Sequence, residues 1–172
     1  MITGEELRAL QAPLKAKYKD DPAAALLVLK ARATLGPDIT AIVETNAAAD
    51  GTTTAGLHPA TGGLGGEACS GDMLLQALVG CAGVTLRAVS TSMGITLRAG
   101  AVLAEGDLDF RGTLGVSKEA PVGFQAIRLS FELDTDATDE QVAKLVQVTE
   151  RYCVVAQTLR AAVPLTSTAA RR

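Results

Sequence analysis

Aromatic residues, histidine and net positive charge are scarce in this chain of 172 residues. It has no Trp, 3% aromatic residues, one His and a net charge of −3. Proteins that bind nucleic acid usually present a basic surface, so this composition argues against a nucleic-acid partner. With so few aromatic rings, the core must be built from Ala, Leu, Val and Ile, and the 48% hydrophobic content suffices for one domain.

The sequence also lacks a long uncharged apolar run. A helix that crosses a bilayer needs about 18 such residues, and the best candidate, residues 73–84, is too short and is interrupted by Gln76. Glu5 and Glu6 lie where a signal peptide would carry positive charge. We therefore expect a cytoplasmic protein with no membrane partner.

Several motifs of catalysis and cofactor binding are missing. There is no G-x-S-x-G sequence, and the Gly-rich run 62–66 is not followed by the G-K-[ST] of a phosphate-binding loop. No C-x-x-C pair occurs, so a zinc site built from the three cysteines and His58 is weakly supported. A thiol hydrolase would need His58 as its base, although a surface histidine is the simpler interpretation. We expect no metal and no organic cofactor.

The elements that the pattern predicts come in runs of strands and of helices. T-x-x-E and T-x-x-Q capping boxes begin the first and last long helices, and alternating or apolar segments between them indicate strands. We expect helices at 4–19, 72–93, 138–151 and 153–160, and strands at 25–35, 39–46, 52–58, 102–111, 127–134 and 163–168. This order favours an α+β fold over a doubly wound sheet. We expect a single domain over 1–172, with 1–21 as an added N-terminal helix.

The helix expected at 72–93 is apolar nearly all round, so it should be the central helix, covered by a sheet or by a partner subunit. It contains Cys81, which taken alone is most simply a small buried side chain. Gly80 and Gly83 flank it, however, and glycine costs about 1 kcal/mol in a helix. Either something packs closely there or access to the sulfur matters.

The other two cysteines lie in different contexts. Cys153 is expected at the start of a new helical turn, where the helix dipole favours a thiolate, and Arg151 adds positive charge nearby. Simple burial is an equally reasonable reading of Cys153. Cys69 lies in the Gly-rich loop and should be the most exposed of the three, either as an incidental thiol or as a second redox partner.

Two segments together resemble the signatures of the OsmC/Ohr family, the osmotically inducible and organic hydroperoxide resistance proteins. The stretch 70–81, SGDMLLQALVGC, resembles the central-helix motif S-P-x-E-L-L-L-A-A-L-A-G-C, and 153–159, CVVAQTL, resembles C-P-V-S-x-T-L. Both occur in the family's order with strands between them. The resemblance implies an OsmC-like fold of antiparallel sheets around a buried central helix, in an intertwined homodimer with active sites at the interface.

The resemblance further implies a thiol peroxidase that reduces organic hydroperoxides without a cofactor. Cys81 would be the peroxidatic thiol and Cys153 the resolving thiol, with an external dithiol as reductant. The family's helix-start Glu corresponds to Asp72, which would lie about 13 Å from Cys81 along a continuous helix. The family's Arg corresponds best to Arg32, with Arg87 as a rival. Val154 and Ala156 replace the family's Pro and Ser.

These departures leave a second hypothesis open. The chain would then be a non-catalytic or weakly catalytic member of the same fold that binds a small apolar ligand at the dimer interface. The peroxidase is the leading hypothesis, and it implies an antioxidant role in the stress response.

Overall fold

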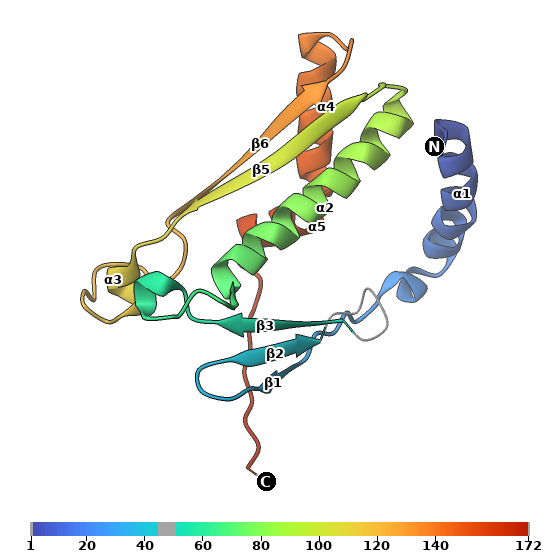
Figure 1. The fold of residues 1–172 in the computed structure, drawn as a ribbon. Coiled ribbons are helices and arrows are strands. Elements are labelled where there is room, and N and C mark those ends of the chain that lie inside the picture. The colour runs from blue at the N-terminus through green and yellow to red at the C-terminus, as the bar shows by residue number, and fades with distance from the viewer. Residues whose placement is uncertain (1, 45–50, 172) are drawn as a thin grey trace.

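A computed structural model describes residues 2–44 and 51–171 of the chain (Figure 1). The N-terminal helix α1 (Gly4–Asp20) begins at a capping box in which Thr3 and Glu6 exchange hydrogen bonds. A short 3₁₀ helix, η1 (Pro22–Ala25), follows it. The start of α1 lies against the end of α2, since a Cβ on Gly4 would come within 2.7 Å of the Thr91 carbonyl oxygen.

The first sheet has the order β1–β2–β3–β4. Its strands are β1 (Ala33–Leu35), β2 (Ala41–Glu44), β3 (Thr52–Gly56) and β4 (Ala68–Cys69), and the turn η2 (Pro59–Thr61) follows β3. The first three strands are antiparallel, and β4 adds in parallel to β3. In Figure 1, β1 to β3 extend away from the second sheet.

The second sheet is an antiparallel pair that positions the central helix. Strands β5 (Ala99–Asp107) and β6 (Ala126–Asp134) pair over their full lengths, and the short helix α3 (Phe110–Thr113) lies in their connection. Helix α2 (Ser70–Met93) runs along this pair and ends at Gly94, whose φ of 69° suits the left-handed conformation. The helices α4 (Asp139–Tyr152) and α5 (Val154–Arg160) also pack on α2.

The core of the chain consists of two small clusters along α2. One is formed by Leu86, Leu97 and Leu145, and the other by Leu78, Ala82, Cys153 and Ala156. Alternate residues of β6 reach them, namely Ile127, Leu129, Phe131 and Leu133. Leu145 and Cys153 are fully buried. The second cluster therefore brings a cysteine into the region where α2 meets the junction of α4 and α5.

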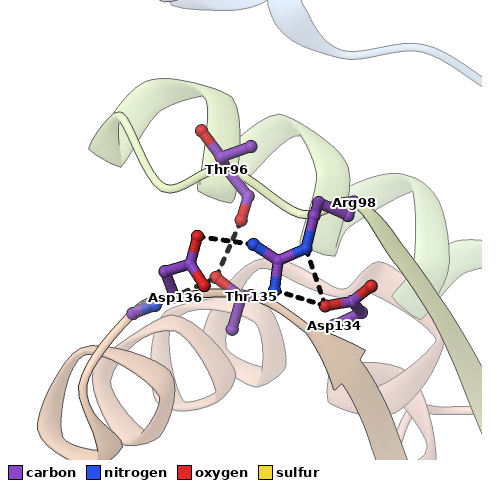
Figure 2. Close-up of polar contacts among 6 residues, drawn as sticks. Thr96, Arg98, Asp134, Thr135 and Asp136 are labelled. Carbon is purple, nitrogen blue, oxygen red and sulfur yellow. Dashed lines mark hydrogen bonds and ion pairs between the residues drawn. The ribbon is translucent and has the colours of Figure 1, made fainter.

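An exposed ion-pair cluster joins the outer ends of β5 and β6 (Figure 2). The guanidinium of Arg98 donates to Asp134 through Nε at 2.8 Å and contacts Asp136 at 2.5 Å. The Thr135 hydroxyl donates to the Thr96 carbonyl at 2.7 Å. These contacts fix the open end of the strand pair directly before the start of α4.

The α+β class is confirmed, and most of the expected elements are present. The strand expected at 25–35 is wrong except for Ala33–Leu35, since only these three residues of the segment form part of a strand. The strand expected at 163–168 is also wrong, because these residues form no helix or strand. The segment 102–111 divides into β5, which starts earlier, and α3. Residues 45 and 46, at the end of the strand expected at 39–46, lie outside the described residues.

Within one chain, the central helix is buried on one side only. Its buried residues are Leu78, Ala82, Leu86 and Ser90, whereas the Val84 side chain is 74% exposed. By length and composition alone, α2 could cross a membrane. The core helices of soluble proteins meet the same criterion. The run 26–29 is also exposed, and each of its four apolar residues is at least 76% accessible.

Candidate functional site

The two cysteines singled out by the sequence lie together. Cys153 is both the C-cap of α4 and the N-cap of α5. Its backbone N–H donates to the Thr149 carbonyl at 2.9 Å, and its carbonyl accepts from the Gln157 N–H at 2.9 Å. This junction directs its side chain into the core, where Cys81 of α2 packs against the same cluster. Both thiols are free, with Cys153 buried and Cys81 half-buried.

The surroundings of the pair favour a thiolate on Cys81. Partial burial opposes ionisation, but hydrogen bonds from the Val155 N–H, the Cys153 thiol, the Val154 N–H and the Thr85 hydroxyl lower the pKa of Cys81 below that of a free cysteine. Burial, together with the adjacent Cys81 sulfur, raises the pKa of Cys153 even though the Ala156 N–H faces it. Of the two thiols, Cys81 is therefore the one that loses its proton more readily.

Helix α5 supplies the strongest of these donors because its first backbone N–H groups have no partner within the helix. Cys153 provides no side-chain cap for them. The N–H groups of Val154 and Val155 are therefore free to face the sulfur of Cys81, where the helix dipole adds to their effect. The chain thus forms an anion-stabilising site from neutral groups. The sequence predicted a helix start at Cys153. It did not predict that the first N–H groups of this helix would hydrogen-bond to Cys81.

Thr85 is the participant that the sequence reasoning missed. It lies one helical turn after Cys81 on α2, a spacing that places two side chains on the same face. Its hydroxyl hydrogen-bonds to the Cys81 sulfur. The signal that could have revealed it is this spacing of four residues between a hydroxyl and a cysteine.

The arginines considered from the sequence are engaged elsewhere in the single chain. Arg32 precedes β1 and lies 3.3 Å from Glu44, with both side chains largely exposed. Arg87 donates to the Leu97 carbonyl at 2.8 Å. Arg151 lies over the Tyr152 ring at 5.5 Å. A role for Arg32 at the thiolate stays a prediction.

Asp72 lies at the N-terminal end of α2, in the first turn. It is exposed and lines a cavity of about 580 Å³ that also includes His58 and Cys69. A role for Asp72 at Cys81 likewise stays a prediction. His58 lines this same cavity and is not among the hydrogen-bonding partners of Cys81, so the arrangement gives no support to a Cys81–His58 hydrolase.

The surface of α2 beside Cys81 is open within the chain. Among the described residues, no heavy atom lies within 4 Å of a Cβ placed on Gly80, and a Cβ on Gly83 would meet only Val102, at 3.9 Å. Close packing at these glycines by another element of the described chain is therefore not seen, and access to the sulfur stays a prediction. The two glycines leave room for a substrate or for a second subunit.

A metal centre finds no support in residues 2–44 and 51–171. They contain no group of three or more His, Cys, Asp and Glu side chains that could hold a metal ion.

Comparisons with known proteins agree with the α+β fold and show the family of the chain. The model of the family of OsmC-like proteins matches residues 63–168, so the chain belongs to the OsmC-like family. No curated protein matches the chain.

Solved structures with the same fold cover most of the chain. An OsmC-like protein from Mycoplasma pneumoniae is 15% identical over 79% of this chain and 89% of its own, with a TM-score of 0.66. The organic hydroperoxide resistance protein OsmC from Legionella pneumophila is 16% identical over 78% and 92%, with a TM-score of 0.61. An organic hydroperoxide resistance protein from Elizabethkingia anophelis, with thiocyanate bound, is 16% identical over 80% and 91%, with a TM-score of 0.60. At these identities the likeness establishes the fold.

Proposed function

We propose that this protein is a thiol peroxidase that reduces organic hydroperoxides, with Cys81 as the peroxidatic thiol and Cys153 as the resolving thiol. Family membership and relatives named for organic hydroperoxide resistance suggest a redox role. The observation that carries the finer assignment is the adjacency of the two thiols with opposite pKa shifts. A peroxidatic thiol must be ionised, and a resolving thiol must lie within reach of it.

The reaction runs in two steps. The Cys81 thiolate attacks an oxygen of the hydroperoxide, so that an S–O bond forms, the O–O bond breaks, and the alkoxide leaves as an alcohol after taking up a proton. The sulfur of Cys153 then displaces the hydroxyl of the Cys81 sulfenic acid, forming an S–S bond and releasing water. An external dithiol reduces this disulfide by exchange.

The active unit in this proposal is a homodimer in the cytoplasm. Val84, the two glycines beside Cys81 and the run 26–29 leave apolar surface exposed on one chain, and such surface usually marks an interface. The sheet formed by β1 to β3 extends away from α2 of the same chain. In a homodimer, this sheet of one copy could bring its Arg32 towards Cys81 of the other copy. There the guanidinium of Arg32, held by the carboxylate of Asp72, would stabilise the thiolate.

Turnover of cumene hydroperoxide with dithiothreitol tests the proposal. We expect the Cys81→Ser variant to lose turnover completely, because serine supplies no nucleophile of comparable strength. The Cys153→Ser variant should complete one oxidation and accumulate a sulfenic acid that dimedone traps at Cys81. Cys69→Ser is the matched control and should turn over normally. Undiminished turnover in Cys81→Ser, or dimedone labelling at another cysteine, would refute the assignment.

A weakly catalytic ligand-binding protein is the second candidate. One observation favours it: a cavity of about 340 Å³ adjoins Gly80 and Gly83, and Val79, Leu86 and Val102 provide apolar lining. Such a site could hold a small apolar ligand between subunits. Saturable binding of the reduced alcohol, cumyl alcohol, without turnover of its hydroperoxide would favour this candidate over the peroxidase.

A further inference from the structure

A second cavity lies at the N-terminal end of α2, away from the thiol pair. It has a volume of about 580 Å³ and is formed by the loop after β3, the first turns of α2 and the connection between β5 and β6. Neither Cys81 nor Cys153 lines it. Its size falls in the range of sites that bind small organic molecules.

Aromatic side chains gather in this cavity although the chain has few of them. Two of the three Phe residues, Phe110 and Phe124, line it together with the only His. The His58 ring stacks on Phe110 with centroids 4.9 Å apart and an angle of 19°. The His58 Nδ1 accepts from the Ala60 N–H at 3.0 Å, which fixes the orientation of the ring and leaves Nε2 as the donor of the neutral form.

Two glycines make room for the second phenylalanine. A Cβ on Gly106 would lie 2.5 Å from Phe124 Cε1, and a Cβ on Gly71 would lie 3.4 Å from Phe124 Cζ. Phe124 therefore rests directly on the backbone of β5 and of the start of α2. A larger residue at Gly106 would displace the ring, so the aromatic wall depends on these positions.

The charge of the lining selects between classes of ligand. Asp72 is the only acidic residue among the described residues of the cavity wall, and the wall includes no Lys or Arg. The neighbouring Arg111 forms an ion pair with Asp109 at 2.5 Å. An anion would thus meet a carboxylate without a compensating cation. A cation would be attracted by Asp72 and by the faces of the aromatic rings.

From these observations, we propose that the cavity binds a small organic cation, with its ammonium group against Asp72 and its apolar body against Phe110 and Phe124. The apolar wall continues through Leu57, Leu74, Leu75 and Leu108. The lining does not include the two cysteines of the proposed peroxidase. Asp72 is the one lining residue that also has a role in that proposal, so the test measures ligand binding by the reduced protein and not turnover.

Calorimetric titration of the reduced protein at neutral pH tests the proposal with three ligands of similar shape. These are 2-phenylethylamine, which is cationic, 2-phenylethanol, which is neutral, and 3-phenylpropionate, which is anionic. We expect the amine to bind at least about tenfold more tightly than the alcohol, and the acid to bind most weakly. The Phe124→Ala variant should weaken the binding of both amine and alcohol.

The Asp72→Asn variant separates charge from shape. It should reduce the affinity for the amine to that for the alcohol, while the affinity for the alcohol stays unchanged and shows that the cavity is intact. Asp139→Asn, which removes a carboxylate from the first turn of α4, is the matched control and should bind all three ligands like the wild type. The proposal is overturned if the wild type does not bind the amine, binds the alcohol or acid as tightly, or keeps its preference in Asp72→Asn. The three wild-type titrations decide it even if that variant does not fold.

Discussion

Cys81 and Cys153 adjoin each other, yet their pKa values move in opposite directions. The difference arises from their donors. Cys81 receives backbone, thiol and hydroxyl hydrogen bonds, whereas Cys153 is fully buried beside the sulfur of Cys81. Stabilisation of an anion by neutral donors acts at short range, so it should depend strongly on each donor.

Alkylation of Cys81 by iodoacetamide, followed by peptide mass spectrometry against pH, measures this effect. Because the pKa of Cys81 is lowered, its alkylation should continue at a pH where a free cysteine, with a pKa of about 8.5, is mostly protonated. Cys153→Ala removes one donor and should shift the midpoint to higher pH, whereas Cys153→Ser keeps a donor and should shift it less. Thr85→Val should also raise the midpoint. A profile identical in all variants would show that these contacts do not hold the charge.

The sequence identified both cysteines because each lies in a recognisable motif, but their stabilising partners follow from the fold. Cys81 and Cys153 are far apart in the chain, and only the packing of α5 on α2 brings the N–H groups of Val154 and Val155 to Cys81. Thr85 could have been predicted from its helical spacing. The cavity around Asp72 could not, since it combines three segments that no local pattern connects.

At the scale of elements, the packing of α4 on α2 holds the thiol pair in place. Leu145, Thr149 and Cys153 follow one another at helical spacing, and each is fully buried. Leu145 packs against Leu86 and Leu97 in one of the two core clusters. Loss of this contact should loosen α4 and thereby the junction that carries Cys153.

Leu145→Ala should lower the free energy of unfolding by about 3 kcal/mol, because it removes buried methyl groups and leaves a cavity. Urea denaturation followed by circular dichroism measures the change. Leu114→Ala is the control, since the Leu114 side chain is 55% exposed and its truncation should have little effect. Equal stability of the two variants would contradict the described core.

Helices were predicted more accurately than strands. The capping boxes at Thr3 and Thr138 mark helix starts through local hydrogen bonds, and both are formed as expected. A strand needs a partner, which the sequence of residues 25–32 does not reveal. These residues are apolar enough for a strand, but in the described part of the chain the first strand of the sheet begins only at Ala33.

At the scale of the whole molecule, α2 leaves apolar surface uncovered within one chain. The two core clusters occupy one side of α2, and Val84 on the exposed side is 74% accessible. A second copy placed against this surface would complete the burial that the sequence predicts for its most apolar helix.

Val84→Glu should therefore dissociate the proposed homodimer, since a charge would be buried at the interface without a partner. Sedimentation velocity should give a dimer for the wild type and a monomer, or a strongly weakened dimer, for the variant. Leu64→Glu is the control, because Leu64 is 98% exposed in the loop before β4. A monomeric wild type would contradict the proposed active unit.

The position of Cys153 between α4 and α5 has a consequence for the melting temperature of the protein. In the proposed cycle, a bond between Cys81 and Cys153 would enclose β5, β6 and α4 in one covalent loop. Closing a loop of this length restricts the unfolded chain and adds about 4 kcal/mol of stability in the chain-entropy model. Scanning calorimetry should thus find a higher melting temperature after treatment with one equivalent of hydroperoxide, and no rise in Cys153→Ser. Resistance to heat would then report whether the protein has met an oxidant since its last reduction.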